Sequence, residues 1–231
     1  SDGWYWNLVT STWQAADPGF DNIGRSGLNP WSYPFPVNAY EDGYRFDANP
    51  LARDAAVNTE TGFSTYSFIV DLTTPTSLVT WPNNGAYVSS AALTVVGTAE
   101  DRFCALNPTI CSAPTRDFAA GIAASSVTVA VAEINVSTMW WTGTAFASGS
   151  PVWSTATFVG TASGTWSFAL PGGALTSNRV YRVVSRAKDR ATNQEIVLTT
   201  NTFVFDTTAP TSIAPAPMGY NTGAPAIYGP A

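Results

Sequence analysis

The chain repeats itself at one fixed spacing. Residues 68–77 read Phe-Ile-Val-Asp-Leu-Thr-Thr-Pro-Thr-Ser, and residues 203–212 read Phe-Val-Phe-Asp-Thr-Thr-Ala-Pro-Thr-Ser. Asp206 therefore stands where Asp71 stands in the earlier copy, and we call the distance between these two residues along the chain the repeat spacing. A repeat at one fixed spacing is typical of a folded unit that is used more than once, so it limits the fold to arrays of similar units.

The repeat spacing also joins further positions upstream. The pairs are Trp6 with Trp141, Trp31 with Trp166, Asp54 with Asp189, Asn58 with Asn193, and Glu60 with Glu195. We therefore expect three parts. Residues 1–76 form the C-terminal part of one repeat, residues 77–211 form a complete repeat, and residues 212–231 begin a third repeat or form a donor or linker tail.

Short runs of β-forming residues fill the complete repeat, and no stretch shows sustained helical periodicity. Valine at 127, 129 and 131 alternates with smaller or polar residues, as in a strand with one buried face. About seven such strands predict an all-β fold, an antiparallel sandwich, with 100–124 as an inserted surface loop. The expected strands are 78–81, 92–99, 127–132, 139–142, 152–153, 165–170, 181–187 and 196–205.

The two cysteines, Cys104 and Cys111, enclose six residues that include Asn-Pro. This spacing suits a closed loop better than the CxxC pair of metal or redox sites, so we predict a disulfide, with two free buried thiols as the alternative. A disulfide here stabilises by roughly 2.5 kcal/mol in the loop-entropy model. It would place the chain outside the cytoplasm, in an oxidising compartment.

Charge is sparse, with a net value of −6 and Lys188 as the only lysine. We therefore expect no nucleic-acid partner, because phosphate binding needs clustered Lys and Arg. No apolar run is long enough to span a bilayer, so we expect no membrane insertion. The absence of histidine excludes a Ser-His-Asp triad and His-based zinc sites. A carboxylate-based enzyme is left open, but the acids lie in turns and linkers, and we predict that the chain is not an enzyme.

Residues 181–193 read Tyr-Arg-Val-Val-Ser-Arg-Ala-Lys-Asp-Arg-Ala-Thr-Asn, and residues 205–210 read Phe-Asp-Thr-Thr-Ala-Pro. This pattern resembles bacterial immunoglobulin-like (Big-type) repeats, which carry a Tyr-x-Val-x-x-x-Ala-x-Asp-x-Ala-Gly-Asn hairpin and an Asp-Thr-Thr-Ala-Pro linker. The resemblance implies tandem immunoglobulin-like sandwiches in a large extracellular or cell-surface protein. Thr192 and Val57 stand where that family usually has Gly, which predicts a wider turn.

The tryptophans recur at equivalent positions of the repeat, as core residues do, so we interpret them mainly as core. Trp140 and Tyr5 are each next to a repeated tryptophan and should point to the opposite face of their strand. We predict that these two side chains are exposed and contact a glycan or a neighbouring subunit.

Acidic residues gather near the expected boundaries of the repeat. Asp71 and Asp206 lie at the two boundaries, and Glu100 and Asp101 follow the second strand. These four are candidate calcium ligands, because calcium takes several oxygen ligands at a rigid junction. The alternative is that Asp and Asn close turns by bonding their own backbone, and no Asp-x-Asp-x-Asp string marks a dedicated calcium loop.

The boundaries of the chain fall inside repeats. We expect either an excerpt of a longer array or a chain whose tail completes the next chain by strand donation. The sequence thus predicts a structural repeat unit of an extracellular bacterial fibre, stalk or adhesin that assembles head to tail. Its partners would be copies of itself or neighbouring repeats. The alternative is a carbohydrate-binding β-sandwich module.

Overall fold

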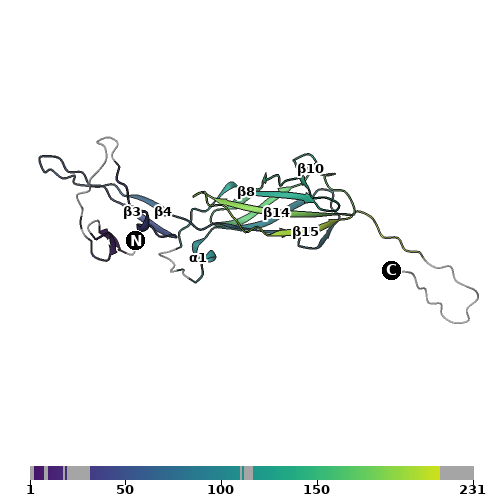
Figure 1. The fold of residues 1–231 in the computed structure, drawn as a ribbon, viewed down its shortest axis with the longest axis horizontal. Helices are drawn as coiled ribbons and strands as arrows, with labels where there is room; N and C mark the ends of the chain where they lie inside the picture. Colours follow the sequence, from purple (N-terminus) through teal and green to yellow (C-terminus); the bar gives the residue numbers. More distant parts are fainter. Residues whose placement is uncertain are drawn as a thin grey trace, which may run out of the picture.

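The computed structural model describes residues 3–7, 10–17, 19, 32–109, 111 and 117–213. Strands dominate this part of the chain, with one short helix, α1 (Phe103–Leu106), and one 3-10 turn, η1 (Val37–Ala39). No helix among these residues is both long and apolar enough to cross a membrane. Figure 1 shows an elongated sandwich with the strands β3 and β4 beyond one of its ends, and residues 206–213 leading away from the other end.

Two facing sheets form the sandwich. The larger sheet has the order β10-β9-β8-β14-β15-β6, with β11 paired to β8, and the smaller has the order β12-β13-β7-β5. All pairs are antiparallel except β15 with β6, which is parallel. The strands are β5 (Thr76–Trp81), β6 (Ala86–Val88), β7 (Thr94–Glu100), β8 (Ile122–Glu133), β9 (Met139–Trp141), β10 (Phe146–Ser148), β11 (Ser154–Thr155), β12 (Thr157–Gly160), β13 (Ser163–Ala169), β14 (Arg179–Asp189) and β15 (Thr200–Phe205).

The predicted all-β sandwich is confirmed, with differences in detail. The strands β6, β10, β11 and β12 were not expected, and 152–153 is not a strand. The partner of β9 is instead β10, which follows it after a short turn. Val152 and Trp153 precede β11, which pairs with β8.

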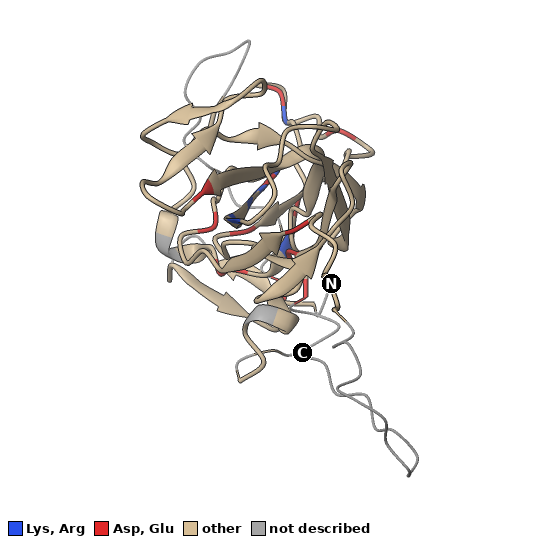
Figure 2. Cartoon of the chain, turned by 90° about the vertical axis from the view of Figure 1, so that its right-hand side faces the viewer, with Lys and Arg blue, Asp and Glu red and all other residues tan. Residues whose placement is uncertain are grey.

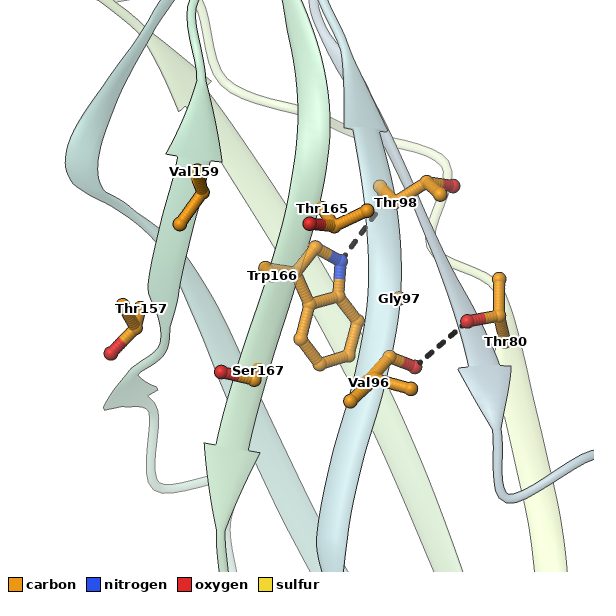
Figure 3. Close-up of a pocket in the computed structure, with 9 residues that line it drawn as sticks. All are labelled: Thr80, Val96, Gly97, Thr98, Thr157, Val159, Thr165, Trp166 and Ser167. Carbon is orange, nitrogen blue, oxygen red and sulfur yellow. Dashed lines mark hydrogen bonds between the residues drawn. The ribbon is translucent and has the colours of Figure 1, made fainter.

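The core fills the space between the two sheets, and Trp141 and Trp166 belong to it as expected. Trp166 lies opposite Gly97 on the neighbouring strand and donates its indole N–H to the carbonyl of Thr98 at 3.0 Å. A Cβ at Gly97 would collide with the Trp166 ring, so the glycine makes room for the indole (Figure 3). The shallow hollow beside these strands is lined mainly by threonine and valine and has no acidic or basic side chain in its lining.

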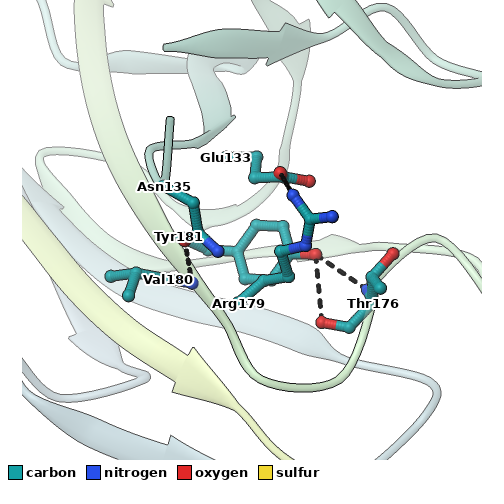
Figure 4. Close-up of polar contacts among 6 residues, drawn as sticks. All are labelled: Glu133, Asn135, Thr176, Arg179, Val180 and Tyr181. Atoms are coloured by element: carbon teal, nitrogen blue, oxygen red, sulfur yellow. Dashed lines mark hydrogen bonds and ion pairs between the residues drawn. The ribbon is translucent and has the colours of Figure 1, made fainter. Parts of the chain in front are cut away.

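Tyr181 fixes the start of β14 (Figure 4). Its hydroxyl accepts a hydrogen bond from the backbone N–H of Thr176 at 2.7 Å and donates to the carbonyl of the same residue at 3.4 Å. Beside it, Arg179 forms an ion pair with Glu133. The side chain of Asn135 accepts from the N–H of Val180 at 2.6 Å. These bonds tie the turn before β14 to the end of β8.

The N-terminal part has two hairpins, one of β1 (Tyr5–Asn7) with β2 (Thr12–Gln14) and one of β3 (Tyr44–Ala48) with β4 (Tyr66–Val70). The β3–β4 pairing has the register of β14–β15 displaced by the repeat spacing, since Tyr44 opposes Val70 as Arg179 opposes Phe205. The same displacement relates two stacked ring pairs. Their centroids are 5.5 Å apart for Phe46–Phe68 and 5.4 Å apart for Tyr181–Phe203.

Six aromatic rings pack together in this N-terminal part, and each is only half-buried. They are Trp6, Trp13, Phe35, Tyr40, Phe46 and Phe68. Tyr181 and Phe203, which are the repeat equivalents of Phe46 and Phe68, are fully buried in the sandwich. The N-terminal cluster therefore resembles one side of the sandwich core without a described second sheet to cover it.

The segment 100–124 was expected to be a surface loop, and this is correct only in part. Cys104 and Cys111 form the predicted disulfide, with their Cα atoms 4.8 Å apart. Phe103, however, is buried, and its ring lies where a side chain at Gly43 would be, 2.6 Å from an ideal Cβ. The N–H of Phe118 also donates to the carbonyl of Gly43 at 3.1 Å. The insertion therefore packs against the N-terminal part and ties it to the sandwich.

Candidate cation site at the linker

A linker, residues 71–77, leads from the end of β4 into the first two residues of β5. Asp71 opens it and is buried. One of its carboxylate oxygens accepts from the N–H of Thr73 at 3.2 Å, and the other accepts from the N–H of Ala120 at 2.6 Å. The first bond shapes the linker, and the second attaches it to the segment that leads into β8.

Asp101 follows β7 and is fully buried, with 0% of its surface exposed. Its Oδ2 accepts from the N–H of Gly121 at 2.7 Å, whereas its Oδ1 has no hydrogen-bond partner. A buried carboxylate oxygen without a partner is costly, because it has lost water and gained nothing in return. This atom is therefore the feature of the cluster that most favours a ligand.

Asp189, the last residue of β14, supplies a third carboxylate. It accepts from both the backbone N–H and the side-chain amide of Asn193, each at 2.8 Å. The same amide donates to the carbonyl of Asp71 at 2.9 Å. Thr192, between them, has a φ of +78°, which is the left-handed conformation that favours glycine.

Glu195 completes the hold on the linker. It is buried and accepts from the N–H and the hydroxyl of Ser77 at 2.8 and 2.6 Å, and from the N–H of Ala187 at 2.9 Å. We call Asp189, Asn193 and Glu195 the linker clamp, because they are the hairpin residues that contact residues 71–77 or approach Asp71. The clamp is far along the chain from the segment that it holds, since Glu195 lies 118 residues after Ser77.

Carboxylate oxygens of Asp71, Asp101 and Asp189 all lie within 4.8 Å of one another. None of the three ion pairs found among the described residues involves them. Arg190 donates to the carbonyl of Ala120 at 3.3 Å rather than to a carboxylate of the cluster. The cluster thus concentrates negative charge in a buried place.

This crowding changes the ionisation of the cluster. Burial and the charges of Asp71 and Asp189 raise the pKa of Asp101 to about 7. Burial also raises the pKa of Asp71, and the charge of Asp189 adds to that effect. Carboxylates keep lone pairs beyond those already used here, and three of them around an unpartnered oxygen form a donor set that suits a hard divalent cation such as calcium.

The structure brings together two of the four candidate calcium ligands, Asp71 and Asp101. Glu100 is next to Asp101 but outside the cluster. Asp206 lies at the other end of the sandwich, since it follows Phe205, whose partner Arg179 begins the strand that Asp189 ends. Asp189 was not among the candidate ligands, because its spacing to Asn193 is also that of a closed turn, and the residue does close such a turn.

The two aromatic candidates differ in exposure. Tyr5 is 40% exposed, as expected. Trp140 does point away from the main core, but it is only 8% exposed, so its predicted exposure is wrong. It is covered on the outer face of the larger sheet by a second cluster that includes Ala130, Val184 and Trp153.

Comparison with known proteins identified no family, since neither a protein-family model nor a curated protein sequence matches this chain.

Proposed function

We propose that this chain is a structural repeat unit of an extracellular bacterial fibre, stalk or adhesin, built from tandem immunoglobulin-like domains. The observation that carries the proposal is the hairpin that occurs twice. Asn58 bonds Asp54 through the same two hydrogen bonds, at the same 2.8 Å, as Asn193 bonds Asp189 one repeat spacing later. The repetition of both hydrogen bonds indicates that the chain contains two copies of the same kind of domain, one after the other.

The strand order supports the immunoglobulin-like part of the proposal. In the immunoglobulin fold, strands A, B, E and D form one sheet, and C, F and G form the other, with additional strands beside C in variable domains. Here β5, β7, β13 and β12 have the first order, and β9, β8, β14 and β15 have the second. The hydroxyl of Tyr181, bonded to the backbone of Thr176 at the start of the F-like strand, matches the tyrosine corner of such domains.

The linker clamp gives the proposed function a mechanism. A tandem fibre transmits bending and pulling through its linkers, and flexible linkers would let neighbouring domains swing freely. Here the linker is bonded at Asp71 and Ser77 by the hairpin of the domain that follows it. A calcium ion between Asp71, Asp101 and Asp189 would fasten the linker further, because Asp71 belongs to the linker, Asp101 directly follows β7 and Asp189 ends β14.

The absence of clustered positive charge is in keeping with a structural role without nucleic acid. Figure 2 shows only short segments of Lys and Arg among the described strands, with Asp and Glu segments near them. The disulfide in the insertion supports an oxidising, extracellular location.

Electron microscopy of cell-surface material, labelled with antibody against this chain, tests the proposal. A strand of about ten residues is roughly 33 Å long, so domains of about 35–45 Å should give fibres labelled at that spacing or a multiple of it. Label on dispersed particles, or on fibres without a regular spacing, would contradict the proposal.

A further inference from the structure

The hairpin at residues 52–60 is a copy of the linker clamp on which no described segment is docked. Asp54, Asn58 and Glu60 lie one repeat spacing before Asp189, Asn193 and Glu195. Their local bonds also agree, since Ala52 donates its N–H to Glu60 at 3.1 Å as Ala187 does to Glu195 at 2.9 Å. We call Asp54, Asn58 and Glu60 the open clamp.

The two clamps differ in what covers them. Asp189 and Glu195 are buried beneath the linker, whereas every residue from Ala52 to Glu60 is exposed. In the linker clamp Oε1 of Glu195 accepts the N–H of Ser77, and the amide of Asn193 donates to the carbonyl of Asp71. No described residue makes either bond to Glu60 or Asn58 in the open clamp.

The chain also contains a second copy of the segment that a clamp holds. Residues 206–212 repeat residues 71–77, with Asp, Thr, Pro and Ser at equivalent positions. The two copies also share a local bond, because Asp206 accepts from the N–H of Thr208 at 2.8 Å as Asp71 accepts from that of Thr73 at 3.2 Å. Residues 207–213 are exposed and lead away from the sandwich (Figure 1).

We propose that the open clamp of one chain binds residues 206–212 of a second copy of this chain, as the linker clamp binds residues 71–77. The inference rests on the proposed function and specifies the contact by which neighbouring chains would assemble. Ser212 donates its N–H and hydroxyl to Glu60, and Asn58 donates to the carbonyl of Asp206. Each chain then makes one contact through its open clamp and another through residues 206–212, so the chains join head to tail in a line.

The open clamp already has the local bonds of the linker clamp, and residues 206–208 already have the turn bond of residues 71–73, which lowers the ordering cost of association. The exposed Glu60 carboxylate gains two donors, and bonds to a charged group are stronger than neutral ones. The docked segment would also lie beside the half-buried rings of the N-terminal part, as β5 lies beside the core of the sandwich. A single chain cannot make this contact with itself, because the linker at 206–212 and the open clamp lie at opposite ends of the molecule (Figure 1).

Disulfide trapping between two full-length variants tests the contact. In the linker clamp the hydroxyls of Ser77 and Ser185 are 2.9 Å apart, and the equivalent positions in the proposed contact are Ser212 and Pro50. A Pro50→Cys chain and a differently tagged Ser212→Cys chain, mixed under mild oxidation, should form a heterodimer. A Ser150→Cys chain, whose exposed position is unrelated to the linker, should not replace the Ser212→Cys chain.

A second substitution separates the open clamp from chance collision. Adding Glu60→Ala to the Pro50→Cys chain should lower the rate of trapping about tenfold, because the carboxylate is the main acceptor. Glu41→Ala, which removes an exposed acid outside the clamp, should leave the rate unchanged. Folding of each variant is checked by the far-ultraviolet circular dichroism of the sandwich.

Three results would overturn the proposal: no heterodimer, equal trapping with Ser150→Cys, or no effect of Glu60→Ala. A synthetic peptide of residues 206–213 that binds the chain while no heterodimer forms would also overturn it, because the clamp would then take a linker from within one polypeptide. If any of these results is found while the labelled fibres still show a regular spacing, the contact is wrong but the proposed function is still supported. If electron microscopy shows no such fibres, the proposed function itself is contradicted.

Discussion

The side-chain amide of Asn193 donates a hydrogen bond to the main-chain carbonyl of Asp71, 122 residues earlier, at 2.9 Å. The same amide bonds Asp189, so one side chain joins the linker to the hairpin at the end of β14. This bond fixes the position of the linker relative to the folded domain. In the proposed fibre, long-range bonds of this kind would let the linker transmit force rather than act as a flexible chain.

Removal of that amide should weaken the domain. Asn193→Ala deletes two hydrogen bonds at a partly buried site and leaves Asp189 with fewer donors, so we expect a loss of about 1–2 kcal/mol in the free energy of unfolding. Urea unfolding monitored by tryptophan fluorescence measures it. Asn58→Ala is the matched control, because it removes the same local bond from an exposed hairpin and should cost less than half as much. Equal losses would show that the bond to Asp71 contributes nothing.

Calcium should stabilise the chain through Asp101. At a free calcium concentration of about 100 times the dissociation constant, binding to the folded state alone adds about 2.7 kcal/mol, which raises the thermal midpoint by several degrees. Asp101→Asn should abolish both this shift and the heat of binding in calorimetry. Asp54→Asn, in the exposed hairpin, should retain them. A calcium shift that survives Asp101→Asn would place the ion elsewhere.

Without calcium, the stability of the chain should fall as the pH rises. The pKa of Asp101 is about 7 in the folded chain because of its burial and the charges of Asp71 and Asp189, against an ordinary value of 3.8. Between these two values the folded state holds a proton that the unfolded state has released, so unfolding becomes easier with rising pH. The stabilisation is complete below pH 3.8 and is lost by about pH 7.

Thermal midpoints in a chelator-containing buffer series from pH 4 to 8 measure this slope. Asp101→Asn should flatten it, and calcium at pH 8 should restore the midpoint of the unsubstituted chain. A slope that is unchanged in Asp101→Asn would assign the effect to other buried acids, of which Glu195 also has a pKa raised by burial.

The two aromatic candidates should respond oppositely to truncation. Trp140→Ala empties a covered position and should cost about 3 kcal/mol in unfolding free energy, whereas Tyr5→Ala should change it by no more than about 0.5 kcal/mol. If Tyr5 contacts a sugar, its substitution should abolish binding on a glycan array without loss of stability. A stable, fully folded Trp140→Ala chain would contradict the packing of the outer cluster.

Much of the fold could be predicted because its information is local. Alternating valines at 127, 129 and 131 mark β8, and the repeat identifies the hairpin at the end of β14. The strand β6 could not be found in this way, since it is very short and pairs in parallel with β15, a strand near the far end of the chain. For Trp140, the alternation of side chains along a strand predicted the face of the sheet on which it lies, but not the neighbouring side chains that cover it there.

The site was predicted in part for a similar reason. Asp71 and Asp101 each follow a strand, and such positions lie at the ends of a sandwich where they can meet. Which end they occupy depends on the direction of each strand in the assembled sheets. That direction separates Asp206 from Asp71 by the length of the sandwich, although both begin a linker of similar sequence.

A cryo-electron microscopy map of the labelled fibres tests the central claim most directly, because it shows both the repeat and the contact. We predict sandwiches in line, at a spacing of about 35–45 Å or a multiple of it, with each linker held by the Asp-Asn-Glu hairpin of the next unit. Density for residues 206–212 should cover Asp54, Asn58 and Glu60. A map in which these three side chains face solvent and successive units have no fixed orientation would contradict the account.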